Sequence, residues 1–136
     1  MFRDITASMN NPVLQQLLSF CLFDNTPQGM ENALNRYPGK MFYGWIENNE
    51  PLGICGFREL QDKVEVCHIA ASPTSRRKGI GKNTVTALCK KYSKTIEAET
   101  DDDAVGFYRK CGFETIELYK EYGNKKYRRW QCILDK

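Results

Sequence analysis

The chain has 136 residues, the usual size of a single domain that can bury a hydrophobic core. Hydrophobic residues make up 41% of it and charged residues 27%, which is typical of globular proteins and excludes a disordered or fibrous chain. The net charge of +3 is too small to indicate a nucleic-acid partner by itself. No apolar run approaches membrane-spanning length and no signal sequence follows Met1, so we expect no membrane partner.

The six cysteines are Cys21, Cys55, Cys67, Cys89, Cys111 and Cys132. They include no C-x-x-C pair, and most lie in or beside periodic apolar segments. This pattern favours reduced, mostly buried thiols of a cytoplasmic protein over a disulfide framework or a zinc site. The chain also has a single histidine, so we expect no metal.

Two helices are predicted after a short first strand at Met1–Thr6. Asn-Pro at residues 11–12 and Thr-Pro at residues 26–27 each begin a helix, because the first residue can cap it and proline suits its first turn. Apolar residues then recur at helical spacing, and the second helix is expected to end near Pro38. We interpret both apolar faces as core packing.

Three strands follow: Met41–Glu47, Leu52–Leu60 and the central strand Val64–Ala71, separated by polar turns. Because strands that are neighbours in sequence usually pair, we expect an antiparallel meander. Side chains on the first two of these strands could wall a substrate pocket, namely Tyr43, Trp45, Phe57 and Arg58.

A basic glycine loop joins the central strand to a helix that runs to about Tyr92. The loop Arg76–Lys82 holds four cations and two glycines. The first N–H groups of a helix lack internal partners and carry partial positive charge, so the loop predicts a site for phosphate or pyrophosphate. A solvated basic loop before an ordinary helix is the plain alternative.

Two common nucleotide-binding patterns do not fit this loop. The mononucleotide P-loop requires a glycine where Arg76 stands, and serine or threonine where Asn83 stands. The dinucleotide fingerprint requires a third glycine where Thr84 stands.

The last third of the chain predicts a strand at Lys94–Thr100, a short helix capped by Asp101–Asp103 and ended by Gly112, and two final strands at Phe113–Tyr119 and Lys126–Leu134. The element order is then β-α-α-β-β-β-α-β-α-β-β. We therefore expect a single α/β domain over residues 1–136, with a mixed central sheet and about four helices. The antiparallel meander should lead into a right-handed parallel crossover.

Two segments resemble the GNAT N-acetyltransferase superfamily. Arg76, Gly79 and Gly81 match the R-x-x-G-x-G loop that binds the pyrophosphate of acetyl-CoA in that family, and Ala104–Phe113 matches its A-x-x-F-Y-x-x-x-G-F segment. The element order also resembles the GNAT fold. The resemblance implies an acyl-CoA-dependent N-acetyltransferase. Such an enzyme transfers an acetyl group from acetyl-CoA to a primary amine by direct attack in a ternary complex.

The resemblance also implies which residues hold acetyl-CoA. Backbone groups of Ile69 and Ala71 would bind the pantetheine arm, and N–H groups from Arg77 to Lys82 would surround the pyrophosphate. The family's central strand carries a bulge and splays from the next strand; the small Ala70 and Ala71 suit such an opening, although tight packing explains them equally. The full set is Ile69, Ala70, Ala71, Arg76, Arg77, Lys78, Gly79, Ile80, Gly81, Lys82 and Asp101. At Asp101 the family often has an asparagine that touches the cofactor, so the charge either weakens this contact or caps the helix.

A general base is expected because a lysine-like amine, with a pKa of about 10.4, is mostly protonated at pH 7. Glu65 lies where histone-acetylating relatives carry their glutamate base, so the resemblance implies this role. The alternative is an exposed glutamate paired with a lysine. His68 is the second candidate, and strict alternation places it on the opposite strand face unless a bulge shifts the phase.

Tyr108 matches the family tyrosine that protonates the leaving thiolate, and the resemblance implies that role. Its alternative role is a core aromatic of an amphipathic helix. A covalent route through Cys67 or Cys111 is less favoured, because the sequence shows no paired histidine.

Two other classes of function remain open. A non-catalytic acyl-CoA sensor would keep the glycine loop but would need neither Glu65 nor Tyr108. Nucleic-acid binding through residues 76–78 and 125–130 is less favoured, because such basic runs are usually solvated. The sequence does not reveal the amine acceptor, and the aromatic-rich last strand could pair with that of a second copy in a homodimer.

Overall fold

The computed structural model describes residues 1–22, 24–35, 39–76 and 78–135. The strands are β1 (Phe2–Asp4), β2 (Met41–Glu47), β3 (Glu50–Glu59), β4 (Lys63–Ala71), β5 (Thr95–Thr100), β6 (Glu114–Tyr122) and β7 (Lys125–Leu134). The helices are α1 (Pro12–Ser19), α2 (Pro27–Asn35), α3 (Ile80–Tyr92) and α4 (Val105–Lys110), with 3-10 turns at Thr6–Ser8 and Pro73–Ser75. The predicted element order is confirmed, and only the two 3-10 turns were not predicted.

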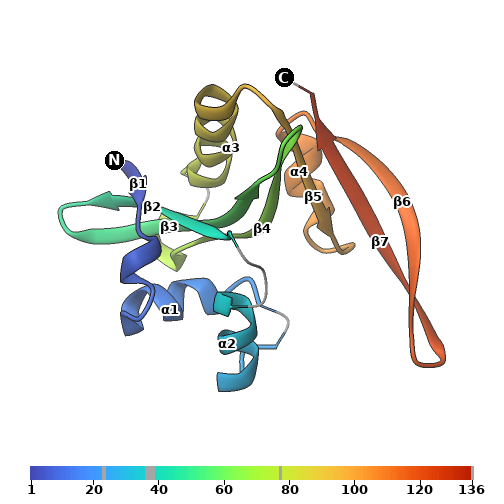
Figure 1. The fold of residues 1–136 in the computed structure, drawn as a ribbon, viewed down its shortest axis with the longest axis horizontal. Coiled ribbons are helices and arrows are strands. Elements are labelled where there is room, and N and C mark those ends of the chain that lie inside the picture. The colour runs from blue at the N-terminus through green and yellow to red at the C-terminus, as the bar shows by residue number, and fades with distance from the viewer. Residues whose placement is uncertain (23, 36–38, 77, 136) are drawn as a thin grey trace.

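The described strands form one sheet with the order β1-β2-β3-β4-β5-β7-β6, and helices cover both of its faces (Figure 1). Helices α1 and α2 bury Leu14, Leu17, Leu18 and Ala33 on one face, against Phe42 and Ile54 of the sheet. Helices α3 and α4 bury Val85, Leu88, Val105 and Tyr108 on the other face. Each helix thus has one apolar face against the sheet, as the spacing predicts.

The predicted helix starts are confirmed by their caps. The Asn11 side chain accepts the N–H of Val13 at 2.8 Å, and Pro12 occupies the first turn of α1. The Thr26 hydroxyl accepts the N–H of Gly29 at 3.2 Å at the start of α2. The predicted end of the second helix near Pro38 falls on residues 36–38, which lie outside the described residues.

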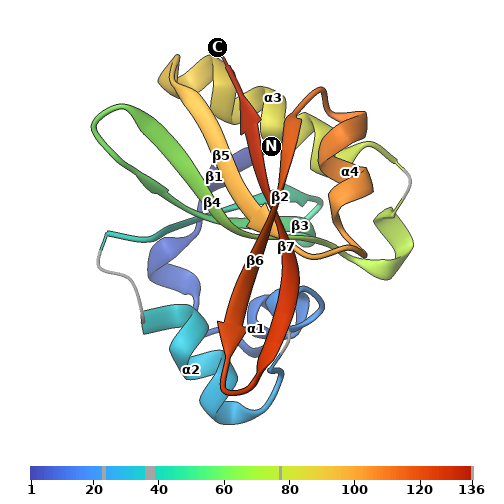
Figure 2. The same cartoon turned by 90° about the vertical axis from the view of Figure 1, so that its right-hand side faces the viewer.

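The strand pairing confirms the antiparallel meander of β2, β3 and β4, followed by the parallel crossover from β4 through α3 to β5. In the last hairpin, β7 lies between β5 and β6, so β6 forms the edge of the sheet. The last strand is therefore not the one that could pair with a second copy. Figure 2 shows that this hairpin extends past the sheet to the side on which α1 and α2 lie.

A bulge and a splay mark the central strand. Gly56 lies opposite His68 but Phe57 lies opposite Val66, so Cys67 is the extra residue of β4. The β4–β5 ladder begins at Lys63 and ends at Val66, within the strands as described. The bulge and the splay implied by the family resemblance are both present: the bulge lies at Cys67, and Ala70 and Ala71 pair regularly with β3.

Candidate active site

Two clefts meet where β4 and β5 separate. The α3 cleft, of about 870 Å³, lies between the second half of β4, the start of α3 and helix α4. The α2 cleft, of about 660 Å³, lies between α2, the first half of β4, β5 and the β6–β7 hairpin. The residues that line both clefts define the junction: Leu22, Cys67, His68 and Glu99. Two molecules could therefore approach each other at this point from opposite directions.

The glycine loop shapes one end of the α3 cleft. Gly79 has φ +79°, a left-handed conformation that is costly for other residues, and α3 begins directly after it. A Cβ atom on Gly81 would lie 2.6 Å from the ring of Phe107, so only glycine lets α3 and α4 approach this closely. Both glycines thus fix the N-terminus of α3 beside the cleft.

Most of the predicted cofactor residues line the α3 cleft: Ile69, Ala70, Ala71, Arg76, Gly79, Ile80, Gly81, Lys82 and Asp101. Lys78 does not line it, and Arg77 lies outside the described residues. The structure therefore brings together residues that are up to 32 positions apart in sequence (101 − 69 = 32).

The backbone of β4 turns polar groups toward this cleft. The N–H of Ser72 donates to the carbonyl of Leu52 at 2.9 Å, so Ser72 faces β3. In an antiparallel ladder alternate residues face opposite sides, and the N–H and C=O groups of Ala71 and Ile69 therefore point away from β3. The carbonyl of Ala71 accepts Nε of Arg76 at 3.4 Å.

Tyr108 is buried on the wall of the α3 cleft, with 6% of its surface exposed. Its ring makes edge contacts with Phe107 and Phe113, at centroid distances of 5.1 and 5.2 Å. Burial raises the pKa of Tyr108 well above its usual value, so the phenol keeps its proton at neutral pH. Tyr108 is therefore part of the core and also lines the cleft, with its phenol protonated.

Asp101 lines the α3 cleft and also caps the turn before α4. Its Oδ1 accepts the N–H of Ala104 at 3.0 Å, which is the helix-capping role that the sequence analysis gave as one of two alternatives for Asp101. Asp102 has a different role, since it accepts hydrogen bonds from Arg128 and Trp130 of β7 at 2.8 Å each.

Glu65 lines the α2 cleft and not the α3 cleft. Its carboxylate forms an ion pair with Arg58 at 3.0 Å, and 34% of the side chain is exposed. The predicted alternative partner was a lysine, so that detail is wrong. Because the bulge at Cys67 shifts the side-chain phase, Glu65 and His68 both line the α2 cleft. The exception that the sequence analysis allowed, a bulge that shifts the phase, is therefore the case that the structure shows.

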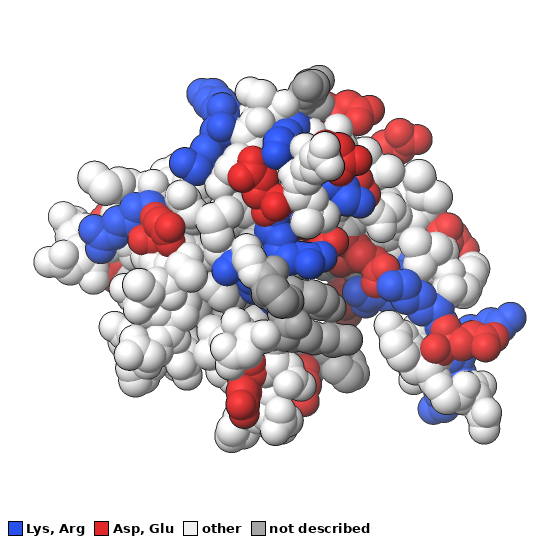
Figure 3. Space-filling model, in the orientation of Figure 1, with Lys and Arg blue, Asp and Glu red and all other residues white. Residues whose placement is uncertain are grey.

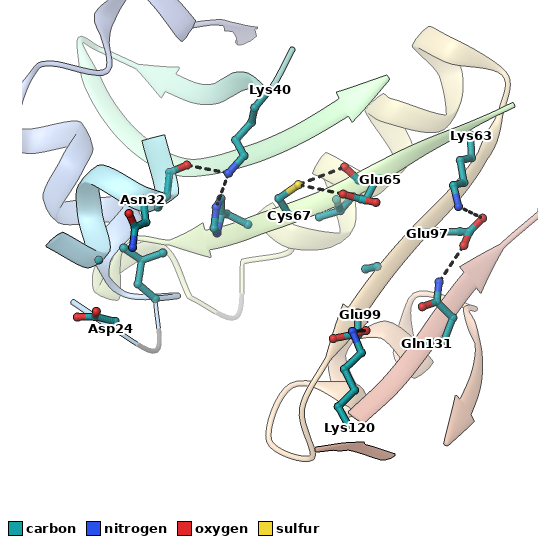
Figure 4. Close-up of a pocket in the computed structure, with 16 residues that line it drawn as sticks. Asp24, Asn32, Lys40, Lys63, Glu65, Cys67, Glu97, Glu99, Lys120 and Gln131 are labelled. Carbon is teal, nitrogen blue, oxygen red and sulfur yellow. Dashed lines mark hydrogen bonds and ion pairs between the residues drawn. The ribbon is translucent and has the colours of Figure 1, made fainter. Parts of the chain in front are cut away.

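His68 is neutral and has a hydrogen-bond partner. Its Nε2 lies 3.0 Å from Nζ of Lys40, which also donates to the carbonyl of Ala33 at 2.7 Å (Figure 4). An ammonium group only donates, so Nε2 must accept. Burial, with the Lys40 charge, lowers the pKa of His68 to about 4. A proton acceptor with this pKa and an occupied lone pair is poorly suited to remove a proton near pH 7.

The thiols near the clefts are protonated. Burial raises the pKa of Cys67, at the junction, to about 11, and burial also raises the pKa of Cys111. Cys67 Sγ lies 3.6 Å from Oε1 of Glu65. All six cysteines are free, and a protonated thiol is a weak nucleophile. The chain therefore offers no activated thiol here for a covalent route.

Several side chains of the α2 cleft were not predicted from the sequence. Glu97 and Glu99 project from β5 toward the cleft, Gln131 from β7 and Lys120 from β6 (Figure 4). The alternation of charged and apolar residues along β5 was a usable signal for both glutamates. Four side chains that could have walled a substrate pocket line neither cleft: Tyr43, Trp45, Phe57 and Arg58. Phe57 is buried in the core, and the rings of Tyr43 and Trp45 pack at a tilt against Phe2.

The described parts of the chain contain no group of three or more His, Cys, Asp or Glu side chains that could hold a metal ion. They also contain no helix that is long and apolar enough to cross a membrane.

The acetyltransferase (GNAT) family model matches residues 11–113, which is most of the chain. The chain therefore belongs to the GNAT family and is an N-acetyltransferase, as the motifs at Arg76–Gly81 and Ala104–Phe113 imply. A relative from Bacillus methanolicus, an uncharacterized N-acetyltransferase in the lysA 3′ region, is 27% identical over 99 residues, which cover 70% of this chain and 82% of the relative.

Solved structures show the same fold at low sequence identity. A GNAT family acetyltransferase from Elizabethkingia anophelis, with acetyl-CoA bound, has a TM-score of 0.73 and 16% identity, and the match covers 99% of this chain and 97% of that one. A Bacillus subtilis acetyltransferase in complex with CoA has a TM-score of 0.68 and 21% identity, and 92% of each chain is covered.

Proposed function

We propose that residues 1–136 form one domain that transfers the acetyl group of acetyl-CoA to a primary amine by direct attack in a ternary complex. The observation that carries this proposal is the junction of the two clefts at Leu22, Cys67, His68 and Glu99. Acetyl-CoA would occupy the α3 cleft and the acceptor the α2 cleft. The thioester carbon and the amine nitrogen would then meet without an enzyme-bound intermediate.

The residues of the α3 cleft fit acetyl-CoA. The outward-facing backbone groups of Ile69 and Ala71 suit the amides of the pantetheine arm, which need one donor and one acceptor each. The N-terminus of α3, with Gly79 in its left-handed conformation, and the cations Arg76 and Lys82 suit the pyrophosphate. The bound acetyl-CoA and CoA of the two structural neighbours support this assignment.

In the reaction the amine nitrogen forms a bond to the acetyl carbon while the C–S bond breaks. A nitrogen that arrives as an ammonium loses two protons in all: the proton acceptor passes one to solvent before the attack, and loss of the second is balanced by the proton that the departing thiolate of CoA gains. Acetyl-CoA supplies the activated thioester, and the chain supplies the proton donor and acceptor. We assign Tyr108 as the donor, because its phenol is protonated and Tyr108 lines the α3 cleft.

We assign Glu65 as the proton acceptor, acting through a water molecule. A protonated amine with a pKa of about 10.4 is a handicap of roughly 4–5 kcal/mol at pH 7, which a base offsets. Glu65 lines the α2 cleft two residues before the bulge, and its partial exposure leaves room for water. His68 is the weaker candidate because of its lowered pKa and its contact with Lys40.

The test mixes the purified protein with acetyl-CoA and a panel of primary amines, and follows the free thiol of CoA and the N-acetylated product by mass spectrometry. The proposal predicts one acetamide per thiol released, and no release without an amine. Binding of acetyl-CoA without release, with every acceptor class from small amines to peptides, would indicate the non-catalytic sensor instead.

A further inference from the structure

The α2 cleft is lined mainly by charged and polar side chains. Its apolar contribution comes from Leu22, Ala33, Val66 and Ala98. Its charged members are Asp24, Glu65, Glu97, Glu99, Lys40, Lys63 and Lys120. Figure 3 shows acidic and basic side chains next to one another on this side of the molecule, between α3 and the β6–β7 hairpin. An acceptor whose remainder is an uncharged aromatic or aliphatic group would desolvate these side chains and give them no new partner, so the cleft suits an acceptor with a charged group besides the reacting nitrogen.

The carboxylates and the lysines of this cleft differ in how firmly they are held. Glu97 and Glu99 project from the middle of the sheet, on β5, and Glu65 lies opposite Glu97 in the β4–β5 ladder. Lys63 and Lys120 reach these carboxylates on long, flexible stems, and 33% and 45% of their side chains are exposed. The carboxylates are thus a fixed part of the cleft, whereas the two lysines are exchangeable.

The lysine pairs show which group the carboxylates accept. Nζ of Lys63 lies 3.4 Å from Oε2 of Glu97, and Nζ of Lys120 contacts Oε1 of Glu99 (Figure 4). A lysine ammonium has the same charge and the same three donors as a protonated primary amine. An incoming amine can therefore replace either lysine without leaving a carboxylate unpaired.

We propose that the acceptor carries at least two ammonium groups, as aliphatic diamines and polyamines do; this inference rests on the proposed function. Glu99 would bind the ammonium that is to be acetylated, and Glu97 would bind the second ammonium. Glu99 lines the junction, and among the described residues it is the carboxylate that faces both clefts. Glu97 lies two residues away on the same face of β5, about 6.6 Å along the strand. A chain of about four or five carbon atoms spans this distance.

Glu99 is suited to this role because it keeps its charge and its position. Burial alone would raise the pKa of Glu99, but hydrogen bonds from Lys120 and Arg129 outweigh burial and hold the pKa below its usual value. Nε of Arg129 lies 3.2 Å from Oε2 of Glu99. Arg129 therefore still orients the carboxylate after Lys120 has been displaced.

The opposite interpretation gives the lysines the binding role, with the carboxylate of an amino acid or peptide as their partner. The junction argues against it, because the reacting nitrogen arrives as a cation and meets Glu99 there. Lys63 and Lys120 line the α2 cleft only, and Lys120 reaches the junction only through its ion pair with Glu99. Lys40 is buried and donates to Ala33 and His68, so it is not an exchangeable cation.

Three acceptors on the same four-carbon skeleton separate these interpretations: 1,4-diaminobutane, 1-aminobutane and 4-aminobutanoate. We expect kcat/KM for the diamine to exceed that for the monoamine at least about tenfold, and the amino acid to be the poorest of the three. Equal values, or a preference for 4-aminobutanoate, would overturn the inference. Glu97→Gln should bring the ratio of diamine to monoamine close to one.

The two interpretations predict opposite changes of KM for the variant Lys120→Met. If Lys120 occupies the place of a substrate ammonium, its removal lowers KM for 1,4-diaminobutane several-fold. If Lys120 binds the acceptor, its removal raises KM, and the inference fails. Lys126→Met is the matched control on the same hairpin, because Lys126 is exposed, pairs with Glu121 and does not line the cleft.

The failure of this inference differs from the failure of the proposed function. Acetyl-CoA binding followed by acetylation of 4-aminobutanoate or a peptide, but not of diamines, overturns the inference alone. A protein that neither binds acetyl-CoA nor acetylates any amine overturns both. Thermal unfolding of each variant without ligand shows that a lost activity is not a lost fold.

Discussion

Replacing Gly79 with alanine isolates the backbone geometry of the glycine loop. Gly79 has φ +79°, and a Cβ atom there would meet no other atom within 4 Å. The substitution therefore adds no clash, and its cost is the left-handed conformation itself, about 1–2 kcal/mol. A domain of 136 residues has an unfolding entropy near 0.29 kcal/mol/K, so the midpoint of thermal unfolding should fall by about 3–7 °C.

The functional part of this prediction concerns the N-terminus of α3. If the loop relaxes to relieve the strain, the first N–H groups of α3 lose their fixed direction, and acetyl-CoA should bind more weakly by a similar free energy, roughly 5–30-fold. Binding is measured by isothermal titration, and stability by differential scanning calorimetry.

Gly106→Ala is the matched control. Gly106 lies in α4 with nothing within 4 Å of the added Cβ atom, and its φ is not in the left-handed region. Alanine is the better helix former by up to about 1 kcal/mol, so the midpoint should rise and acetyl-CoA binding should stay the same. An unchanged midpoint and unchanged binding in Gly79→Ala would refute the claim that this backbone conformation shapes the site.

Three further predictions concern proton transfer and charge. Tyr108→Phe should lower kcat by about 10²–10⁴-fold while acetyl-CoA binding persists, and an unchanged kcat would remove Tyr108 as the proton donor. Glu65→Gln should lower kcat and spare acetyl-CoA binding; full activity with this variant would exclude Glu65 as the base. The pKa of His68 is lowered from 6.5 to about 4, so the unfolded chain binds more protons between these values. Stability should therefore fall as the pH drops from 6.5 to 4, and His68→Gln should make this part of the unfolding profile flatter.

Much of the fold could be predicted because local signals agreed with the tertiary structure. Caps at Asn11 and Thr26, alternation along β2 and the left-handed Gly112 all specify elements by short-range chemistry. The order of the last two strands could not be predicted, since a hairpin can add to a sheet through either of its strands. The pairing of β7 with β5 depends on packing, such as that of Cys132 against the α3 and α4 core.

The candidate site was predictable where it rests on the glycine loop and less so elsewhere. The bulge at Cys67 decides that Glu65 and His68 share a cleft, and a bulge leaves little trace in a sequence. Glu97 and Glu99 line the site because the pairing of β4 with β5 ends at Val66. This separation of the two strands depends on the packing of three strands together. Tyr43 and Trp45 were possible pocket walls from the sequence but pack against Phe2 of β1, because aromatic side chains on a strand pack equally well against another element.

The central claim is that the α3 cleft holds acetyl-CoA, and the most direct test is the midpoint of thermal unfolding with acetyl-CoA, ATP or NAD present. At about 100 times its dissociation constant a ligand stabilises the folded state by roughly 2.7 kcal/mol, which corresponds to about 8–10 °C for this chain. We expect this rise of the unfolding midpoint with acetyl-CoA and no comparable rise with ATP or NAD. A rise with ATP or NAD but none with acetyl-CoA would contradict the central claim.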